Sequence, residues 1–233
     1  MMNWLQKLFS SSSDPLTKEL FPILGFKPKN IRLYHQALCH SSVESNSYGH
    51  NERLEFLGDA ILNEVIADYL YHELPDKNEG TLSDIRSKIV RRKTLNELAE
   101  KLEISPLVKS NLGITPPPSI YGNAFEALIA AIYLDKGIVT CKSFILEKVI
   151  APHFSLELLE KEISSYKKHF LQWAQKHNKK YSFRLINESG ESHKKEFVIG
   201  LFVEGNKLAT AQGSSKKKAE EIASKIACET IGL

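Results

Sequence analysis

The sequence predicts two domains: an all-α domain, followed by a small α+β domain with the order α-β-β-β-α. Apolar residues recur three or four positions apart over 16–154, which is the period of helices that bury one face. After Ser164 the apolar period shortens to two in three short stretches. The balance of charge changes at the same point. Residues 1–163 contain 18 basic and 21 acidic residues, whereas residues 164–233 contain 13 basic and 7 acidic residues. We expect domains at 1–160 and 164–233.

In the first domain, helical segments are separated by Pro, Gly and Ser residues. The expected segments are 31–42, 51–73, 81–103, 123–135 and 141–150. The stiffest break is the Thr115-Pro-Pro-Pro-Ser119 loop. No stretch of this domain alternates in the manner of a strand, so we expect it to be all-α. Residues 1–14 are too short and too polar for a signal peptide or a membrane span, so we interpret them as a flexible arm.

The second domain is expected to begin with a helix and to continue with three strands and a last helix. These elements are expected at 166–177, 180–188, 197–203, 207–213 and from about Ser215 onward. Only a few residues near 158–164 join the two domains, which indicates a short linker.

Composition favours a soluble globular protein, with 42% hydrophobic and 25% charged residues. Cys39, Cys141 and Cys228 are too widely spaced for a disulfide framework or a zinc motif. A reducing compartment fits this cysteine usage best, and we expect a cytoplasmic protein without a membrane contact.

The most informative stretch of the first domain is an acidic helix. Glu52, Glu55 and Asp59 fall within a sector of about 60° at the helical period. Carboxylates along one stripe repel one another, and a Mg²⁺ ion would relieve that repulsion. A solvated acidic face is the simpler alternative. Gly58 lies between the acids, and because glycine costs a helix about 1 kcal/mol, it suggests that something approaches closely there.

Two further acidic positions are candidates. Asn123 and Glu126 are three residues apart at the expected start of a helix, so their side chains share a face. They could instead form a capping box, with Asn123 as the N-cap. Glu79 precedes Gly80 next to a turn, and by itself indicates only a surface turn.

The last helix opens with three lysines, Lys216, Lys217 and Lys218. Cations at a helix N-terminus oppose the helix dipole, at a cost of about 0.3–1 kcal/mol each. A phosphate would offset that cost, because free backbone N–H groups and ammonium groups converge there. A solubilising charge run is the alternative that we weigh against phosphate binding.

The acidic stretch Asn51-Glu-Arg-Leu-Glu-Phe-Leu-Gly-Asp59 resembles the signature of the ribonuclease III family. The resemblance continues, in the expected order, through Asp76-Lys-Asn-Glu-Gly80 and Asn123-Ala-Phe-Glu-Ala-Leu-Ile129. It covers nearly the whole chain and implies a Mg-dependent endonuclease that cleaves double-stranded RNA to 5′-phosphate and 3′-hydroxyl ends. Processing of ribosomal RNA precursors and other structured transcripts is the implied role.

The resemblance also implies site residues. It assigns a Mg²⁺ site, in which Mn²⁺ can substitute, to Glu55, Asp59, Asn123 and Glu126. Asp59 and Glu126 match the most critical positions, while Glu52 and Glu79 match positions that handle the RNA strand near the cleavage centre. Many family members carry Asp at position 123, so Asn123 predicts an active enzyme with an altered metal requirement.

A homodimer with two such sites across a shared cleft is implied as well, with no small-molecule cofactor. Phe56 matches an aromatic position that the family uses at the dimer interface, and ordinary core packing is the alternative for this residue.

The stretch from about Tyr166 to Leu233 resembles a double-stranded-RNA-binding domain. The resemblance implies that Lys216, Lys217 and Lys218 contact phosphates across a major groove. His193 matches a minor-groove contact, and Lys168 and Gln172 match another minor-groove surface. Trp173 and Phe183 are expected in the core, because paired bases are not available for stacking.

Two other functions are weighed against the nuclease. A non-cleaving scaffold that binds duplex RNA is favoured only by Asn123, and a pure scaffold has no need for clustered acids. A DNA nuclease is a distant third, since the second domain argues for A-form RNA.

Overall fold

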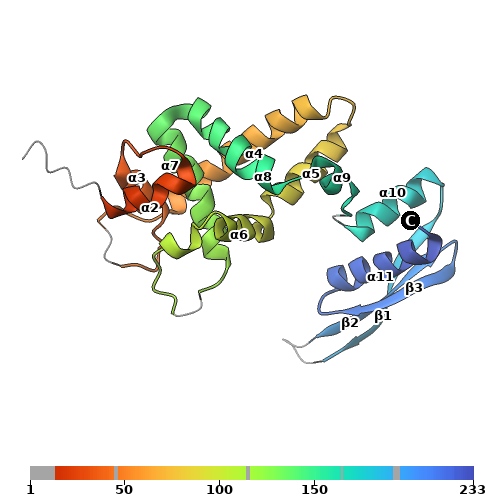
Figure 1. Cartoon of the computed structure of the whole chain (residues 1–233). Coiled ribbons are helices and arrows are strands. Elements are labelled where there is room, and N and C mark those ends of the chain that lie inside the picture. The colour runs from red at the N-terminus through yellow and green to blue at the C-terminus, as the bar shows by residue number, and fades with distance from the viewer. Residues whose placement is uncertain (1–13, 45–46, 114–115, 164, 191–194) are drawn as a thin grey trace, which may run out of the picture. The chain divides into compact units, whose positions relative to one another are not determined.

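The computed structural model describes residues 14–44, 47–113, 116–163, 165–190 and 195–233. The chain divides into two compact units, Met1–Glu160 and Lys161–Leu233. The first unit is helical and the second combines a three-stranded sheet with helices (Figure 1). The expected fold class is therefore confirmed. Among the described residues, no helix combines the length and apolar character that a membrane span requires.

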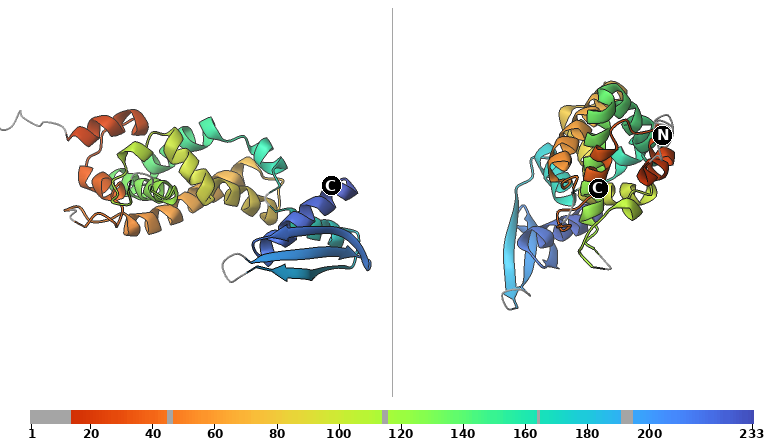
Figure 2. Two further views of the ribbon diagram at one scale, coloured as in Figure 1. Left: turned by 90° about the horizontal axis from the view of Figure 1, so that it is seen from below. Right: turned by 90° about the vertical axis from the view of Figure 1, so that its left-hand side faces the viewer.

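The first unit is built around one buried helix, α7 (Ser119–Phe144). Helices α3 (Ile31–Ala37), α4 (Glu52–Glu73) and α6 (Arg92–Lys101) pack against it (Figure 2). Every side chain from Ala127 to Ile132 is fully buried, so α7 has no solvated face over this stretch. It supplies the centre of the core.

Shorter helices complete this unit. They are α2 (Pro15–Leu24), α5 (Glu79–Val90), the 3₁₀ turn η1 (Ser105–Leu107), the π-helical η2 (Ile145–Ile150), α8 (Ala151–His153) and α9 (Leu156–Lys161). Asp14 caps α2 by accepting a hydrogen bond from the Leu16 backbone N–H, so this last residue of the expected arm belongs to a helix start.

Three of the expected segments have different boundaries in the structure. The segment 81–103 is two helices, because Arg91 adopts an extended backbone conformation between α5 and α6. The segments 123–135 and 141–150 fall in a helical run that begins at Ser119 and passes from α7 into η2. Gly137 interrupts that run with a positive φ of 81°, which only glycine adopts readily.

The second unit has the order α10 (Tyr166–Lys176), β1 (Tyr181–Ser189), β2 (Glu196–Val203), β3 (Asn206–Gly213) and α11 (Lys216–Ile231). The strands form an antiparallel sheet in chain order, and both helices lie on one face of it (Figure 2). Phe170 and Leu201 are fully buried between helices and sheet. Trp173 and Phe183 pack against this core, as expected.

Candidate active site

The acidic face of α4 forms as the helical period predicts. Glu52 and Asp59 are exposed and Glu55 is half-buried, while Leu54 and Ile61 are buried on the opposite face. The apolar face anchors the helix in the core, so the three carboxylates are held along one line at the surface.

Gly58 is the point at which α4 touches α7. A β-carbon built at Gly58 would lie 1.7 Å from the backbone oxygen of Glu126, well inside any allowed contact. The close approach suggested by this glycine is therefore that of a neighbouring helix backbone. It brings Glu55 and Asp59 of one helix beside Glu126 of the other.

These side chains line one pocket of about 550 Å³. Its lining residues are His40, Ser41, Asn51, Glu52, Glu55, Phe56, Asp59, Arg92, Asn123 and Glu126. Helix α7 begins at Ser119, so Asn123 lies in its second turn and the capping-box interpretation is wrong. Asn123 and Glu126 point instead from inside α7 toward the acids of α4.

The electrostatics of the pocket follow from crowding of like charge. Burial raises the pKa of Glu126 to about 7, and the nearby Asp59 and Glu55 carboxylates add to the rise. Burial also raises the pKa of Glu55, whereas the Arg92 guanidinium and a hydrogen bond from Asn123 act in the opposite direction. The repulsion expected from the sequence is thus present, and Arg92 partly offsets it.

Three residues outside the predicted site support this pocket. Asn63 donates a hydrogen bond of 2.8 Å from Nδ2 to Oδ1 of Asp59, and its i, i+4 spacing on α4 was the available signal. The Nδ1 atom of His40 lies 2.9 Å from the Ser42 hydroxyl. Arg92 comes from a different helix, and nothing in its local sequence relates it to the acids.

The donor set of the pocket fits a hard divalent cation. Carboxylate and amide oxygens are the ligands that Mg²⁺ prefers, and the lining contains no thiol. Within the part of the chain that the structure describes, however, no three His, Cys, Asp or Glu side chains converge closely enough to hold an ion.

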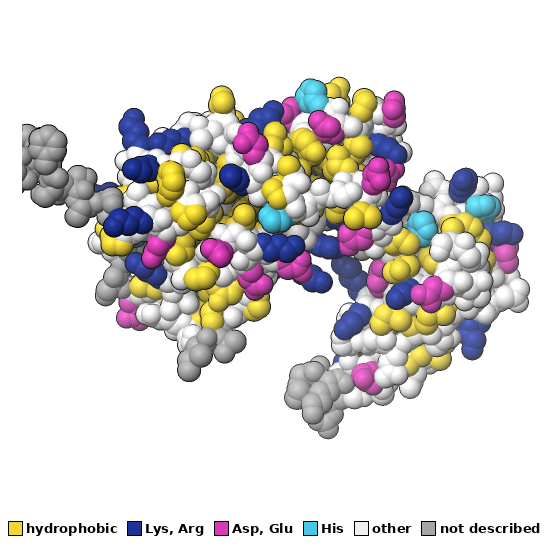
Figure 3. Space-filling view, viewed as in Figure 1, with side chains coloured by type: hydrophobic (Ala, Val, Ile, Leu, Met, Phe, Trp, Pro, Cys, Tyr) yellow, Lys and Arg dark blue, Asp and Glu magenta, His cyan; other side chains and the backbone are white. Residues whose placement is uncertain are grey.

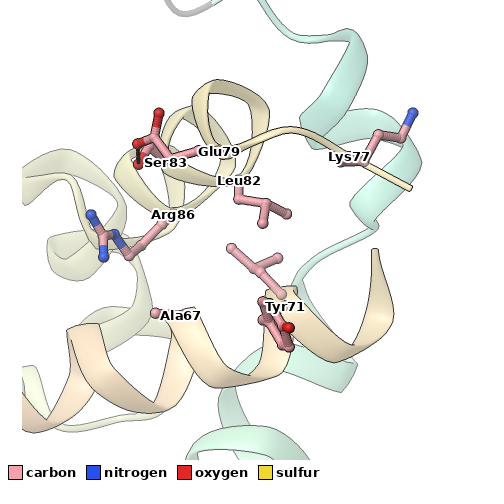
Figure 4. Close-up of a pocket in the computed structure, with 8 residues that line it drawn as sticks. Ala67, Tyr71, Lys77, Glu79, Leu82, Ser83 and Arg86 are labelled. Carbon is pink, nitrogen blue, oxygen red and sulfur yellow. Dashed lines mark hydrogen bonds between the residues drawn. The ribbon is translucent and has the colours of Figure 1, made fainter. Parts of the chain in front are cut away.

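Glu79 and Phe56 lie elsewhere than the simplest interpretations suggest. Glu79 accepts a hydrogen bond of 2.9 Å from the Ser83 hydroxyl and lines a second pocket of about 380 Å³ with Tyr71, Leu82 and others (Figure 4). It is not part of the acidic pocket of its own chain. Phe56 is 81% exposed, so ordinary core packing is the wrong explanation for this aromatic residue.

The second unit presents the three lysines at the start of α11. Lys216, Lys217 and Lys218 are all exposed, and Ser215 caps the helix by accepting from the Lys218 N–H. Lys168 and Gln172 are exposed on α10. Figure 3 shows Lys and Arg side chains at several places on this unit. His193 lies outside the described residues, so its expected contact has no structural counterpart here.

A helical unit with an acidic pocket, joined to an α-β-β-β-α unit with a lysine-lined helix start, defines a nuclease of double-stranded RNA. Residues 30–153 match the family model described as Ribonuclease-III-like, and residues 166–231 match the double-stranded RNA binding motif. The chain belongs to the ribonuclease III family.

Individual relatives agree with this assignment. Ribonuclease 3 of Zunongwangia profunda is 42% identical, over 93% of this chain and 91% of the relative. Ribonuclease 3 of Flavobacterium psychrophilum is 40% identical, over 96% and 95%. The crystal structure of the nuclease domain of ribonuclease III from Campylobacter jejuni is similar, with 32% identity and a TM-score of 0.54, and the match covers 61% of this chain and all of that one. The protein is a double-strand-specific endoribonuclease of a metal-dependent family, and nothing favours the non-cleaving scaffold.

Proposed function

We propose that this endoribonuclease works with Mg²⁺, or Mn²⁺ in its place, held by Glu55, Asp59, Asn123 and Glu126. The observation that supports this proposal is the single pocket shared by these four oxygen donors from two helices. A bound divalent cation would lower the pKa of a water molecule and stabilise charge on the phosphate oxygens. Asp59 and Glu126 carry the largest roles in this proposal.

Other residues of the chain are proposed to orient the metal ligands and the RNA strand. Asn63 holds the carboxylate of Asp59 through its 2.8 Å hydrogen bond, which limits the rotation of that ligand. Glu52 is exposed at the start of α4 and lines the pocket, and we propose that it contacts the RNA strand. Cleavage is proposed to leave 5′-phosphate and 3′-hydroxyl ends.

The second unit is proposed to hold the duplex. Lys216, Lys217 and Lys218 would contact phosphates, while Lys168, Gln172 and His193 would reach the minor groove. The exposure of the three lysines at a capped helix start supports the phosphate contact, because backbone N–H groups and ammonium groups share one end of α11. Recognition of this kind depends on A-form shape more than on sequence.

The active form is proposed to be a homodimer with Phe56 at the interface. An aromatic side chain that is 81% exposed favours a buried environment in a partner. A structure of the Campylobacter jejuni nuclease domain that is 34% identical to this chain is described as having a region involved in dimer formation. A dimer is also the simplest way for Glu79 to act near a cleavage centre, since it lines a different pocket within its own chain.

Structured transcripts, including ribosomal RNA precursors, are the proposed substrates, and the cytoplasm is the proposed location. Cys39, Cys141 and Cys228 are all buried, in keeping with a reducing compartment.

The proposed metal site is tested with a long RNA duplex. The parent should cut only when Mg²⁺ or Mn²⁺ is added, and Glu126→Gln should cut at least about 100-fold more slowly, because it keeps the shape but loses a charged ligand. Glu64→Gln, on the exposed part of α4 outside the pocket, is the matched control. Cleavage by Glu126→Gln at the parent rate would reject the site, and a 5′-phosphate-dependent exonuclease checks the product ends.

A further inference from the structure

Arg92 lies on the wall of the acidic pocket, although it belongs to neither acidic helix. It is the first residue of α6, and it also lines an adjoining hollow of about 230 Å³ together with Gly122, Asn123 and Glu126. Helix α6 is fixed against α7 here, since Asn96 Oδ1 accepts a hydrogen bond of 3.0 Å from the Gly122 N–H. The backbone of Arg92 is therefore held by packed helices at a set position relative to Asn123 and Glu126.

Arg92 is exposed, and its guanidinium group acts on the Glu55 and Glu126 carboxylates through longer-range electrostatics. Among the described residues it makes no hydrogen bond, and no carboxylate lies within 4 Å of it. Its two cationic neighbours on the chain are engaged, because Arg91 donates to the Thr94 hydroxyl and Lys93 pairs with Glu97. Three cations at a helix N-terminus oppose the helix dipole and destabilise the helix. The presence of Arg92 there, without a direct partner among the described residues, therefore suggests a functional role.

Neutralising the carboxylates is one possible reason, and the geometry argues against it as the main one. Arg92 lowers the pKa of Glu55 and Glu126 from a distance, and among the described residues it forms no direct ion pair of the bidentate kind that is frequent between guanidinium and carboxylate groups. The pocket also contains a second unused donor. The Asn51 side chain is 1% exposed, and its Nδ2 atom has no hydrogen-bond partner in the described part of the chain.

A phosphodiester supplies what this pocket lacks. Its nonbridging oxygens accept hydrogen bonds, and its negative charge suits an unpaired guanidinium next to a cation site. We propose that Arg92 contacts a nonbridging oxygen of the phosphodiester that is cleaved, and so acts as a cation beside the metal ligands. This inference rests on the proposed metal site in the same pocket.

The charge of Arg92 should act in opposite directions on metal binding and on cleavage. A cation beside the ligands repels Mg²⁺ when RNA is absent, and Asn123 already leaves the ligand set with one negative charge fewer than Asp would give. Removing the charge of Arg92 should therefore tighten Mg²⁺ binding to the RNA-free protein while it slows cleavage of the RNA.

The test compares Arg92→Gln and Arg92→Lys with Lys93→Gln, which removes a charge from the same helix turn outside the pocket. At saturating RNA and Mg²⁺, Arg92→Gln should lower the single-turnover cleavage rate about 10- to 100-fold, the range for loss of a hydrogen bond to a charged group. Arg92→Lys should fall between, and Lys93→Gln should match the parent. By calorimetry without RNA, Arg92→Gln should bind Mg²⁺ about 3-fold more tightly or better.

Three results would overturn the inference. They are parent-like cleavage by Arg92→Gln, cleavage that returns to the parent rate as Mg²⁺ is raised, and Mg²⁺ binding that weakens in the variant. The last two would mean that Arg92 only assembles the carboxylates. Failure of the metal site itself has a different signature, because the parent would then neither bind Mg²⁺ in this pocket nor depend on it for cleavage.

Discussion

Gly58 sets the separation of the two helices that carry the acidic pocket. Because a β-carbon there would meet the Glu126 backbone oxygen at 1.7 Å, Gly58→Ala must push α4 away from α7. We expect a loss of about 1–3 kcal/mol or more in the free energy of unfolding, as for other overpacked interiors, together with reduced cleavage. Urea unfolding and a cleavage assay measure the two effects.

Gly80→Ala is the matched control for this substitution. Gly80 lies in the first turn of α5, and its added β-carbon would meet the Asn78 Oδ1 atom at an ordinary 3.5 Å. The control should be neutral or stabilising by up to about 1 kcal/mol. Equal stability of the two alanine variants would contradict the close approach of the helices.

Asn123 governs the charge of the ligand set. Asn123→Asp adds a negative charge beside Glu55 and removes the hydrogen bond that Asn123 gives it. We expect the metal-free variant to melt at a lower temperature, and Mg²⁺ to raise its Tm more than it raises that of the parent. Half-maximal cleavage should need less Mg²⁺. Asn187→Asp, exposed in the second unit, controls for the charge, and an unchanged metal dependence would reject any role for the uncharged side chain.

At the residue scale, the sequence was informative where function depends on spacing along one helix. The stripe of Glu52, Glu55 and Asp59 and the close approach at Gly58 both follow from helical geometry. Helical geometry does not predict that Arg92 lines the pocket or that Asn123 lies in the second turn of α7. The first depends on packing between helices far apart in the sequence, and the second on α7 starting four residues earlier than the apolar pattern indicates.

The short helix α9 is joined to α5 by a buried cation. Lys88 is 2% exposed, and its Nζ atom donates a 2.6 Å hydrogen bond to the Leu159 carbonyl and lies 2.7 Å from Asp84. Lys88→Met should lower the free energy of unfolding by about 1.5–3 kcal/mol, the contribution of hydrogen bonds to charged groups. It should also speed amide hydrogen exchange over 156–161, because α9 loses its anchor.

Lys93→Met is the control for this element, since Lys93 has a 79% exposed side chain and should change stability by less than about 0.5 kcal/mol. Unchanged exchange in α9 of the Lys88 variant would show that other contacts hold this helix. The sequence placed only a short linker in this region, because six residues of helical spacing are too few to stand out from a loop.

The lysines of α11 give the second prediction about an element. Replacing Lys216, Lys217 and Lys218 by Gln should weaken RNA binding, because ammonium groups that neutralise phosphates are removed. The slope of log Kd against log salt should fall by about 1 for each phosphate that is no longer neutralised. The control replaces three exposed lysines at the C-terminal end of α10 and in the loop that follows it, Lys176, Lys179 and Lys180. RNA binding is measured from low to high salt for both triple variants. Equal slopes for the two would indicate that Lys216, Lys217 and Lys218 serve only solubility.

At the scale of the whole molecule, the sequence predicts two units of opposite net charge. The spacing of apolar residues and the balance of charge both change at the same point of the sequence. Secondary structure of the second unit follows closely for a physical reason: Ser165 and Ser215 cap its helices and short strands alternate clearly. What one chain cannot supply is the surroundings of Glu79 and Phe56. Glu79 was expected near the cleavage centre and Phe56 at a partner, and the proposed homodimer would place both residues beside a second chain.

Substitution of Phe56 tests the proposed homodimer. In a twofold dimer each chain presents the same patch, so Phe56→Ala removes two contacts at once. At about 1.5–3 kcal/mol for each buried aromatic side chain, the dimer dissociation constant should rise about 100- to 10,000-fold. Sedimentation over a range of concentrations measures it. Val139→Ala is the control, because Val139 on α7 has the same 81% exposure. If the valine variant dissociates and the phenylalanine variant does not, the interface lies on another face of the molecule.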